Sequence, residues 1–165
     1  KKLILNSIQI AEPAGVKNYK GKGNIFEKNN FSLLEVMKIG SAHDRISNCY
    51  YQNYREVLDF GLPLLIFLKG KISRRKAIEI LYLNFLCNDL DSHILRKFGV
   101  NKAKIVKYKA IMLKRKIHIF KDNYKLFKEL DSYLKISHIN PGTCADLTVT
   151  TLLIDKIRDI FKFPI

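Results

Sequence analysis

The residues best suited to binding or catalysis lie in HINPGTCADLTVTTLLIDKI, residues 138–157, where an acid closely follows a Pro-Gly turn. The Pro141-Gly142 turn is followed by Thr143, Cys144, Ala145 and Asp146. A helix N-terminus exposes unpaired N–H groups and about half a positive charge, and a glycine beside it lets a phosphate approach. Asp146 favours the helix dipole but repels a phosphate unless a metal ion lies between them. Thr143 and Asp146 also fit a helix-capping pattern, so the stretch predicts either a capped surface helix or a turn that binds a charged ligand.

Two further motifs combine acids with basic or polar residues. In SAHDRISN, residues 41–48, Asp44 and Arg45 lie in an expected helix, either as a solvated pair or as part of a cation-binding site. In NDLDSHILRKFG, residues 88–99, Asp91 lies at an expected helix start with Arg96 beyond it. Asp91 is either an N-cap residue or a ligand of a divalent cation, and the spacing alone leaves both interpretations open.

The chain is strongly basic. Thirty Lys and Arg residues oppose fifteen acids, which gives a net charge of +15. Codon bias in an A/T-rich genome and attraction for a polyanion both account for such a composition. The basic clusters RRK, residues 74–76, and KRK, residues 114–116, are interpreted as solvated faces in preference to a nucleic-acid surface, because no known nucleic-acid-binding motif accompanies them. Any nucleic-acid binding is expected to be non-specific.

The cysteines and the apolar stretches indicate a soluble, cytoplasmic protein. Three cysteines lie far apart without a C-x-x-C pair, which fits neither a disulfide framework nor a zinc site. The longest uncharged apolar stretch, residues 61–68, is too short to cross a bilayer, so no membrane association is expected.

Hydrophobic periodicity predicts an all-α fold, a compact domain of roughly seven helices over residues 1–165. Helices are expected over residues 1–12, from Ser32 to about residue 58, and up to residue 69 after a break at Gly61 and Pro63. Further helices are expected from Ser73 through residue 86, from residue 92 to Gly99, and over residues 102–118, 122–136 and 143–161. A long polar loop is expected between the first two, over residues 15–30.

Together these motifs resemble the triphosphoribosyl-dephospho-CoA synthase family, in an archaeal-type member. LLEVMKIGSAHDRISNCYYQNYREVLDFGLPLL resembles the family's Asp-Arg helix and the Gly-x-Pro that follows it. DSHILRKFG resembles its Asp-Thr-x-Ile-x-Arg-x-x-Gly segment, and NPGTCADL resembles its Pro-Gly-x-x-Ala-Asp-Leu helix start. The match departs from the family pattern at Ser92, which stands for Thr, and at Thr143 and Cys144, which stand for Gly-Ser. The family's N-terminal motifs have no counterpart, so the chain resembles the C-terminal part of a longer architecture.

The resemblance implies transfer of 5-triphosphoribose from ATP to the 2'-hydroxyl of 3'-dephospho-CoA, with release of adenine. Such a transfer needs a carboxylate to orient or deprotonate the hydroxyl, and Mg²⁺ to hold the triphosphate. By resemblance, Asp44, Asp91 and Asp146 are the catalytic and metal-binding carboxylates. The implied substrate-binding residues are Arg45, Arg96, Pro141, Gly142, Thr143 and Cys144. No organic cofactor is implied.

The sequence leaves open the acceptor and activity, the class of protein and the oligomeric state. A family member of this kind could bind a nucleotide with another acceptor or without catalysis, and a basic helical nucleic-acid-binding module is the alternative from a different class. Both a monomer and a homodimer fit the sequence.

Overall fold

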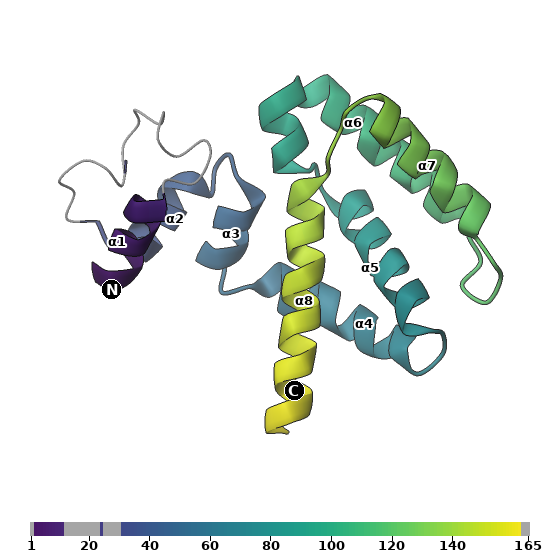
Figure 1. Cartoon of the computed structure of the whole chain (residues 1–165), viewed down its shortest axis with the longest axis horizontal. Helices are drawn as coiled ribbons and strands as arrows, with labels where there is room; N and C mark the ends of the chain where they lie inside the picture. Colours follow the sequence, from purple (N-terminus) through teal and green to yellow (C-terminus); the bar gives the residue numbers. More distant parts are fainter. Residues whose placement is uncertain (1, 12–23, 25–30, 163–165) are drawn as a thin grey trace. The chain divides into compact units, whose positions relative to one another are not determined.

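The protein is all-α, as the periodicity predicts. The computed structural model describes residues 2–11, 24 and 31–162, and within these residues there are eight α-helices, one π-helical segment and no strand (Figure 1). The loop expected over residues 15–30 lies outside the described residues, apart from Asn24. Contacts divide the chain into two compact units, Lys1–Asn53 and Tyr54–Ile165. Contacts alone do not show whether each unit folds on its own, so the single domain over residues 1–165 stays a prediction.

The first unit contains three short helices: α1 Lys2–Ala11, α2 Leu33–Gly40 and α3 Arg45–Tyr51. A capping box starts α2 at the predicted residue, since the Ser32 N–H donates to Glu35 Oε2 at 2.7 Å and the Glu35 N–H donates to Ser32 Oγ at 3.3 Å. The single helix predicted from Ser32 to about residue 58 is wrong. A turn over residues 41–44 separates α2 from α3, because Asp44 caps a new helix instead of continuing the first.

The second unit contains a π-helical segment and five α-helices. Their bounds are η1 Glu56–Gly61, α4 Leu62–Lys69, α5 Arg74–Asn88, α6 Ser92–Lys116, α7 Tyr124–Ile136 and α8 Gly142–Phe161. The helix α5 packs against α4, α6 and α8, while α8 also packs against η1 and α4, and α7 packs against α6 (Figure 1). The unit is thus organised around α5 and α8, which connect its other helices.

The sequence of α5 explains its central place. A helix that is hydrophobic on all sides must be surrounded by other elements, and ILYLNFL within α5 carries apolar residues on every face. Leu81, Leu83 and Phe85 are completely buried, and the buried Asn84 satisfies its amide by donating to the Ile80 carbonyl at 2.8 Å.

Gly61 and Gly99 mark two irregularities in the second unit. The break predicted at Gly61 and Pro63 is wrong, because the π-helical segment ends at Gly61 and α4 begins at the next residue, with Pro63 in its first turn. Proline fits there because the first N–H groups of a helix need no partner within it. Gly99 lies inside α6 with φ of 80°, which only glycine adopts freely. The predicted stop at Gly99 is therefore a kink between two helical segments.

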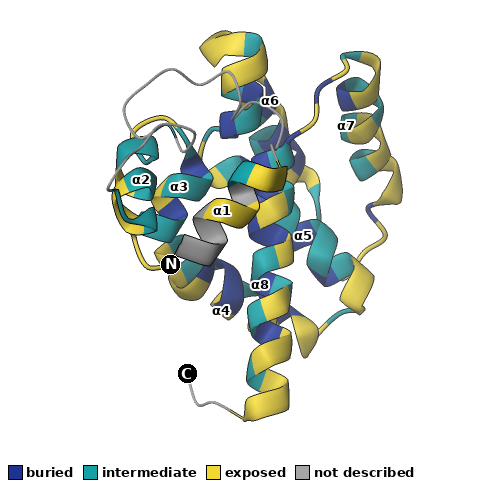
Figure 2. Ribbon diagram, turned by 60° about the vertical axis from the view of Figure 1, so that its left-hand side comes forward, coloured by how far each residue is buried: buried dark blue, intermediate teal, exposed yellow. Residues whose placement is uncertain are grey.

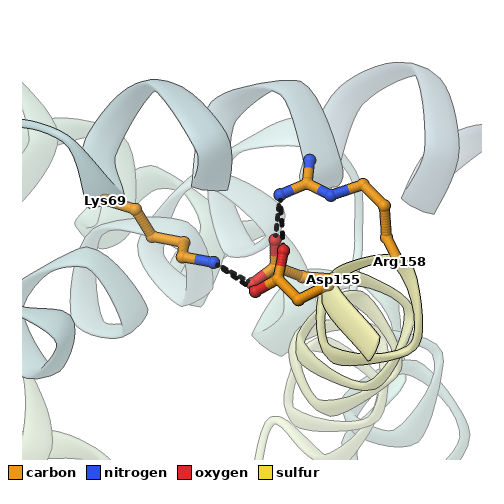
Figure 3. A network of polar contacts seen from close by, with 4 residues as sticks. Lys69, Asp155 and Arg158 are labelled. Atoms are coloured by element: carbon orange, nitrogen blue, oxygen red, sulfur yellow. Dashed lines mark hydrogen bonds and ion pairs between the residues drawn. The ribbon is translucent and has the colours of Figure 1, made fainter. Parts of the chain in front are cut away.

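Polar residues of α8 are satisfied within the unit. Thr148 and Thr151 are buried and donate to the carbonyls of Cys144 and Leu147 at 2.7 and 2.8 Å. Farther along, the buried Asp155 accepts from Lys69 Nζ at 2.6 Å and from Arg158 at 3.0 Å, which ties α8 to α4 (Figure 3).

The last turns of α8 are mostly exposed (Figure 2). In α4, Leu62, Leu65 and Leu68 are buried, whereas Ile66 and Phe67 are exposed. Of the helices in residues 2–11 and 31–162, none combines the length and the apolar composition that a membrane span requires.

Candidate functional site

The starts of α6 and α8 meet at a buried carboxylate in the second unit. Asp91 is 2% exposed and is the N-cap of α6, where its Oδ1 accepts from the Ile94 N–H at 3.1 Å. Its Oδ2 accepts from the Cys144 N–H in the first turn of α8 at 2.9 Å. Asp91 therefore caps its own helix and also places a negative charge at the positive end of α8.

The Thr143 hydroxyl forms a second link between the same two helices. Thr143 Oγ1 lies 2.9 Å from Ser92 Oγ and accepts from the His93 N–H at 3.1 Å. The predicted capping pair of Thr143 and Asp146 is therefore wrong. The helix α8 begins at Gly142 with Pro141 as its N-cap residue, and the Thr143 hydroxyl contacts α6 instead of its own backbone.

Gly142 lies against the imidazole of His93. A Cβ placed on Gly142 would be 3.4 Å from His93 Cγ and Nδ1, which is an ordinary van der Waals contact. His93 is half-buried, and its ring borders the Pro-Gly turn.

Tyr82, on α5, lies near the same two helix starts. Burial raises the pKa of its phenol strongly, and the negative charges of Cys144 and Asp91 raise this pKa further. The Tyr82 phenol is consequently neutral at neutral pH and also well above it. The sequence did not indicate Tyr82 as a site residue, because a tyrosine within an apolar run such as that of α5 is usually part of the core. His93, whose ring borders the Pro-Gly turn, is likewise a member of the site.

Two other predicted site residues of the second unit are exposed. Asp146 is exposed one turn along α8 from the start, and within the described part of the chain its carboxylate has no ion-pair or hydrogen-bond partner. Arg96 is exposed on α6, one turn beyond His93. Both are open to solvent, whereas Asp91 is enclosed.

Asp44 and Arg45 belong to the first unit. Asp44 is the N-cap of α3, with its Oδ1 accepting from the Ser47 N–H at 2.9 Å, and Arg45 is buried. The expectation that this pair lies within a helix is thus wrong for Asp44. Convergence of Asp44 with Asp91 and Asp146 stays a prediction.

The resemblance implies a Mg²⁺ ion, and Asp91 and Asp146 differ in whether their carboxylates could bind it. Asp91 does not fit a direct ligand, since both oxygens already accept from backbone N–H groups inside the protein. Asp146 fits an ion that arrives with a triphosphate, because Mg²⁺ is often held by one or two carboxylates plus substrate phosphates. Over residues 2–11, 24 and 31–162, no three His, Cys, Asp or Glu residues form a group able to hold a metal.

Two positions that depart from the family pattern contact each other. Ser92 replaces a threonine and Thr143 replaces a glycine in the motifs described above, and their hydroxyl oxygens are 2.9 Å apart. The two motifs thus form one structural unit.

Comparison with protein families gives a match that covers nearly the whole chain. The model of the CitG family, described as ATP:dephospho-CoA triphosphoribosyl transferase, matches residues 2–164. Comparison with curated proteins and comparison with solved structures give no match. The match includes both motifs that meet at Asp91 as well as the Asp44 segment, and the chain belongs to the CitG family.

Proposed function

We propose that the protein transfers 5-triphosphoribose from ATP to the 2'-hydroxyl of 3'-dephospho-CoA and releases adenine. The observation that supports this most directly is the junction of the two family motifs. Segments more than fifty residues apart in the chain are joined by the bond from the Cys144 N–H to Asp91 and by the contact of Ser92 with Thr143. The junction holds His93 beside the turn, with Arg96 and Asp146 on the same two helices.

The reaction breaks the bond between ribose C1 and adenine and forms a bond from C1 to the acceptor oxygen. An oxocarbenium-like transition state is expected, as in glycoside cleavage. The attacking hydroxyl must lose a proton, and the departing adenine must receive one. We propose the carboxylates of Asp44 and Asp146, together with the His93 imidazole, as the groups that orient or transfer these protons.

We propose a positioning role for Asp91. A carboxylate that accepts two backbone N–H groups while 2% exposed sets the distance between α6 and α8. Arg96 would bind a phosphate of the substrate, because a guanidinium donates to phosphate oxygens in a fixed geometry. Mg²⁺, which Asp146 would hold together with the triphosphate, would neutralise phosphate charge.

Adenine release tests the proposal. The protein is incubated with ATP, Mg²⁺ and 3'-dephospho-CoA, and free adenine and the ribosylated product are separated by chromatography. We expect both products, only when both substrates are present. Asp146→Asn should lower the rate at least about tenfold, and Glu129→Gln, an exposed acid on α7, should leave it unchanged. ATP binding without adenine release would contradict the proposal and favour a nucleotide-binding member with another acceptor.

A further inference from the structure

A groove at the opposite end of α5 from Asp91 combines basic and aromatic side chains. It has a volume of about 420 Å³ and lies between the start of α5 and the start of α7, beside the α6–α7 turn. Its lining at the start of α5 is Ser73, Arg75, Lys76 and Glu79, and its lining at the turn and the start of α7 is Asp122, Asn123, Tyr124 and Phe127. Arg75 Nε donates to Glu79 Oε1 at 3.0 Å, and the Arg75 side chain is 79% exposed, so it remains accessible to a phosphate. The helix α5 contains fifteen residues, so the groove is about 21 Å from the Asp91 junction at a rise of 1.5 Å per residue.

The fold concentrates charge around this groove. It brings both basic clusters of the sequence, residues 74–76 and residues 114–116, to the same end of the second unit, because α5 begins where α6 ends. Residues 73–79 and 114–128 contain nine Lys and Arg residues and two acids, Glu79 and Asp122. These two short segments therefore carry about half of the net charge of +15.

The α6–α7 turn is held rigidly from inside. Asn123 is 7% exposed, and its Nδ2 donates to the carbonyls of His118 and Lys121 at 2.8 and 3.0 Å, while its Oδ1 accepts from the His118 N–H at 3.2 Å. This ordered turn nevertheless presents large rings to solvent, with Phe120 64% exposed and Tyr124 56% exposed. Exposed rings on an ordered, strongly basic surface are a combination suited to stacking on bases.

From this juxtaposition we propose that the groove binds single-stranded nucleic acid without sequence preference. Arg75, Lys76 and the surrounding lysines would contact phosphates, and bases would stack on Tyr124 and Phe120. A duplex keeps the faces of its bases stacked inside, so it cannot use the rings. A lipid surface would use the charge without needing a groove. This activity does not depend on the proposed transferase reaction.

Fluorescence anisotropy with a labelled oligothymidylate of about twelve nucleotides tests the proposal. We expect the single strand to bind more tightly than a duplex of equal length and more tightly than vesicles rich in phosphatidylserine. Binding should weaken steeply with salt, and Arg75→Ala should reduce the slope of log K against log salt by roughly 0.7, as the loss of one phosphate contact predicts. Lys104→Ala, an exposed lysine on α6 outside the groove, is the matched control.

The aromatic variants separate stacking from charge. Tyr124→Ala should weaken binding at least about fivefold, whereas Tyr108→Ala, which removes a ring 63% exposed on α6, should change it less than about twofold. Phe120→Ala serves as the second variant, so the test stands even if Tyr124→Ala does not fold. Equal effects of the groove and control variants would overturn the proposal, as would tighter binding to the duplex or to the vesicles.

Discussion

Replacement of Asp91 by asparagine distinguishes a structural carboxylate from a metal ligand. In the folded protein, Asp91 accepts the N–H groups of Ile94 and Cys144 with separate oxygens, at 3.1 and 2.9 Å. Asparagine keeps one acceptor, but its NH₂ group must then face the second N–H. The change therefore replaces one charge-assisted hydrogen bond by a contact between two donors in the interior.

The magnitude follows from the burial of the site. A hydrogen bond to a charged group contributes about 1.5–3 kcal/mol, and a buried N–H without a partner costs about 1–3 kcal/mol. We expect Asp91→Asn to lower the free energy of unfolding by about 2–4 kcal/mol, and at roughly 2–4 °C per kcal/mol the melting temperature falls accordingly. Urea and thermal unfolding followed by the helical circular dichroism signal measure this loss.

A control substitution and a hydrogen-exchange measurement test whether the loss of stability arises at the Asp91 hydrogen bonds. Asp131→Asn removes an exposed acid that pairs with Lys135 at 2.6 Å on α7, and it should cost less than about 0.5 kcal/mol. Hydrogen exchange should rise at the Cys144 amide in Asp91→Asn and stay unchanged in Asp131→Asn. If Asp91 instead belonged to a cluster of like charges awaiting a cation, its neutralisation would leave the ligand-free protein equally or more stable. That result would refute the structural role.

Further substitutions test the packing, the titration and the exposed acid. Gly61→Ala should cost about 1–3 kcal/mol in unfolding experiments, because its Cβ would lie 2.6 Å from Phe85 Cζ, whereas Gly70→Ala meets no atom within 4 Å and should change stability by less than about 1 kcal/mol. The pKa of Tyr82 is raised in the folded protein, so its contribution to the free energy of unfolding is fully present below pH 10, the ordinary pKa of Tyr. That contribution is lost as the pH rises from 10 through the raised pKa of the folded protein. Urea midpoints at pH 9 and pH 11 should therefore fall more in the wild type than in Tyr82→Phe, and equal falls would contradict the assignment. Asp146→Asn should leave the ligand-free melting temperature nearly unchanged and weaken binding of Mg-ATP at least about tenfold by calorimetry, and an unchanged affinity would show that Asp146 is not a ligand.

Periodicity predicted the helical fold well because most helices here bury one continuous apolar stripe. It failed between Ser32 and residue 58, where the apolar pattern continues through the turn over residues 41–44. Asp44 ends that pattern by capping α3, and a capping side chain competes locally with helix continuation. A sequence pattern averaged over several turns does not register such a local competition.

The sequence predicted several residues of the candidate site but not the contacts between them. The resemblance selected Asp91, Gly142 and Thr143, all of which lie at the junction of α6 and α8. It did not predict that Thr143 bonds to the neighbouring helix, because a capping pattern describes only contacts within one helix. Tyr82 was missed because its proximity to Asp91 arises from the packing of α5, which no local motif records.

The junction also determines how a phosphate could be held near α8. Of its first three N–H groups, that of Gly142 donates to the Asn140 carbonyl at 2.9 Å and that of Cys144 donates to Asp91. Only the Thr143 N–H has no partner within the described part of the chain, and Thr143 is 4% exposed. The Cys144 N–H, which the resemblance assigns to substrate binding, thus donates to the carboxylate of Asp91 within the protein. Because the positive end of α8 is already compensated, a substrate phosphate must be attracted by other groups, and side chains such as Arg96 and a Mg²⁺ ion at Asp146 would have to supply that attraction.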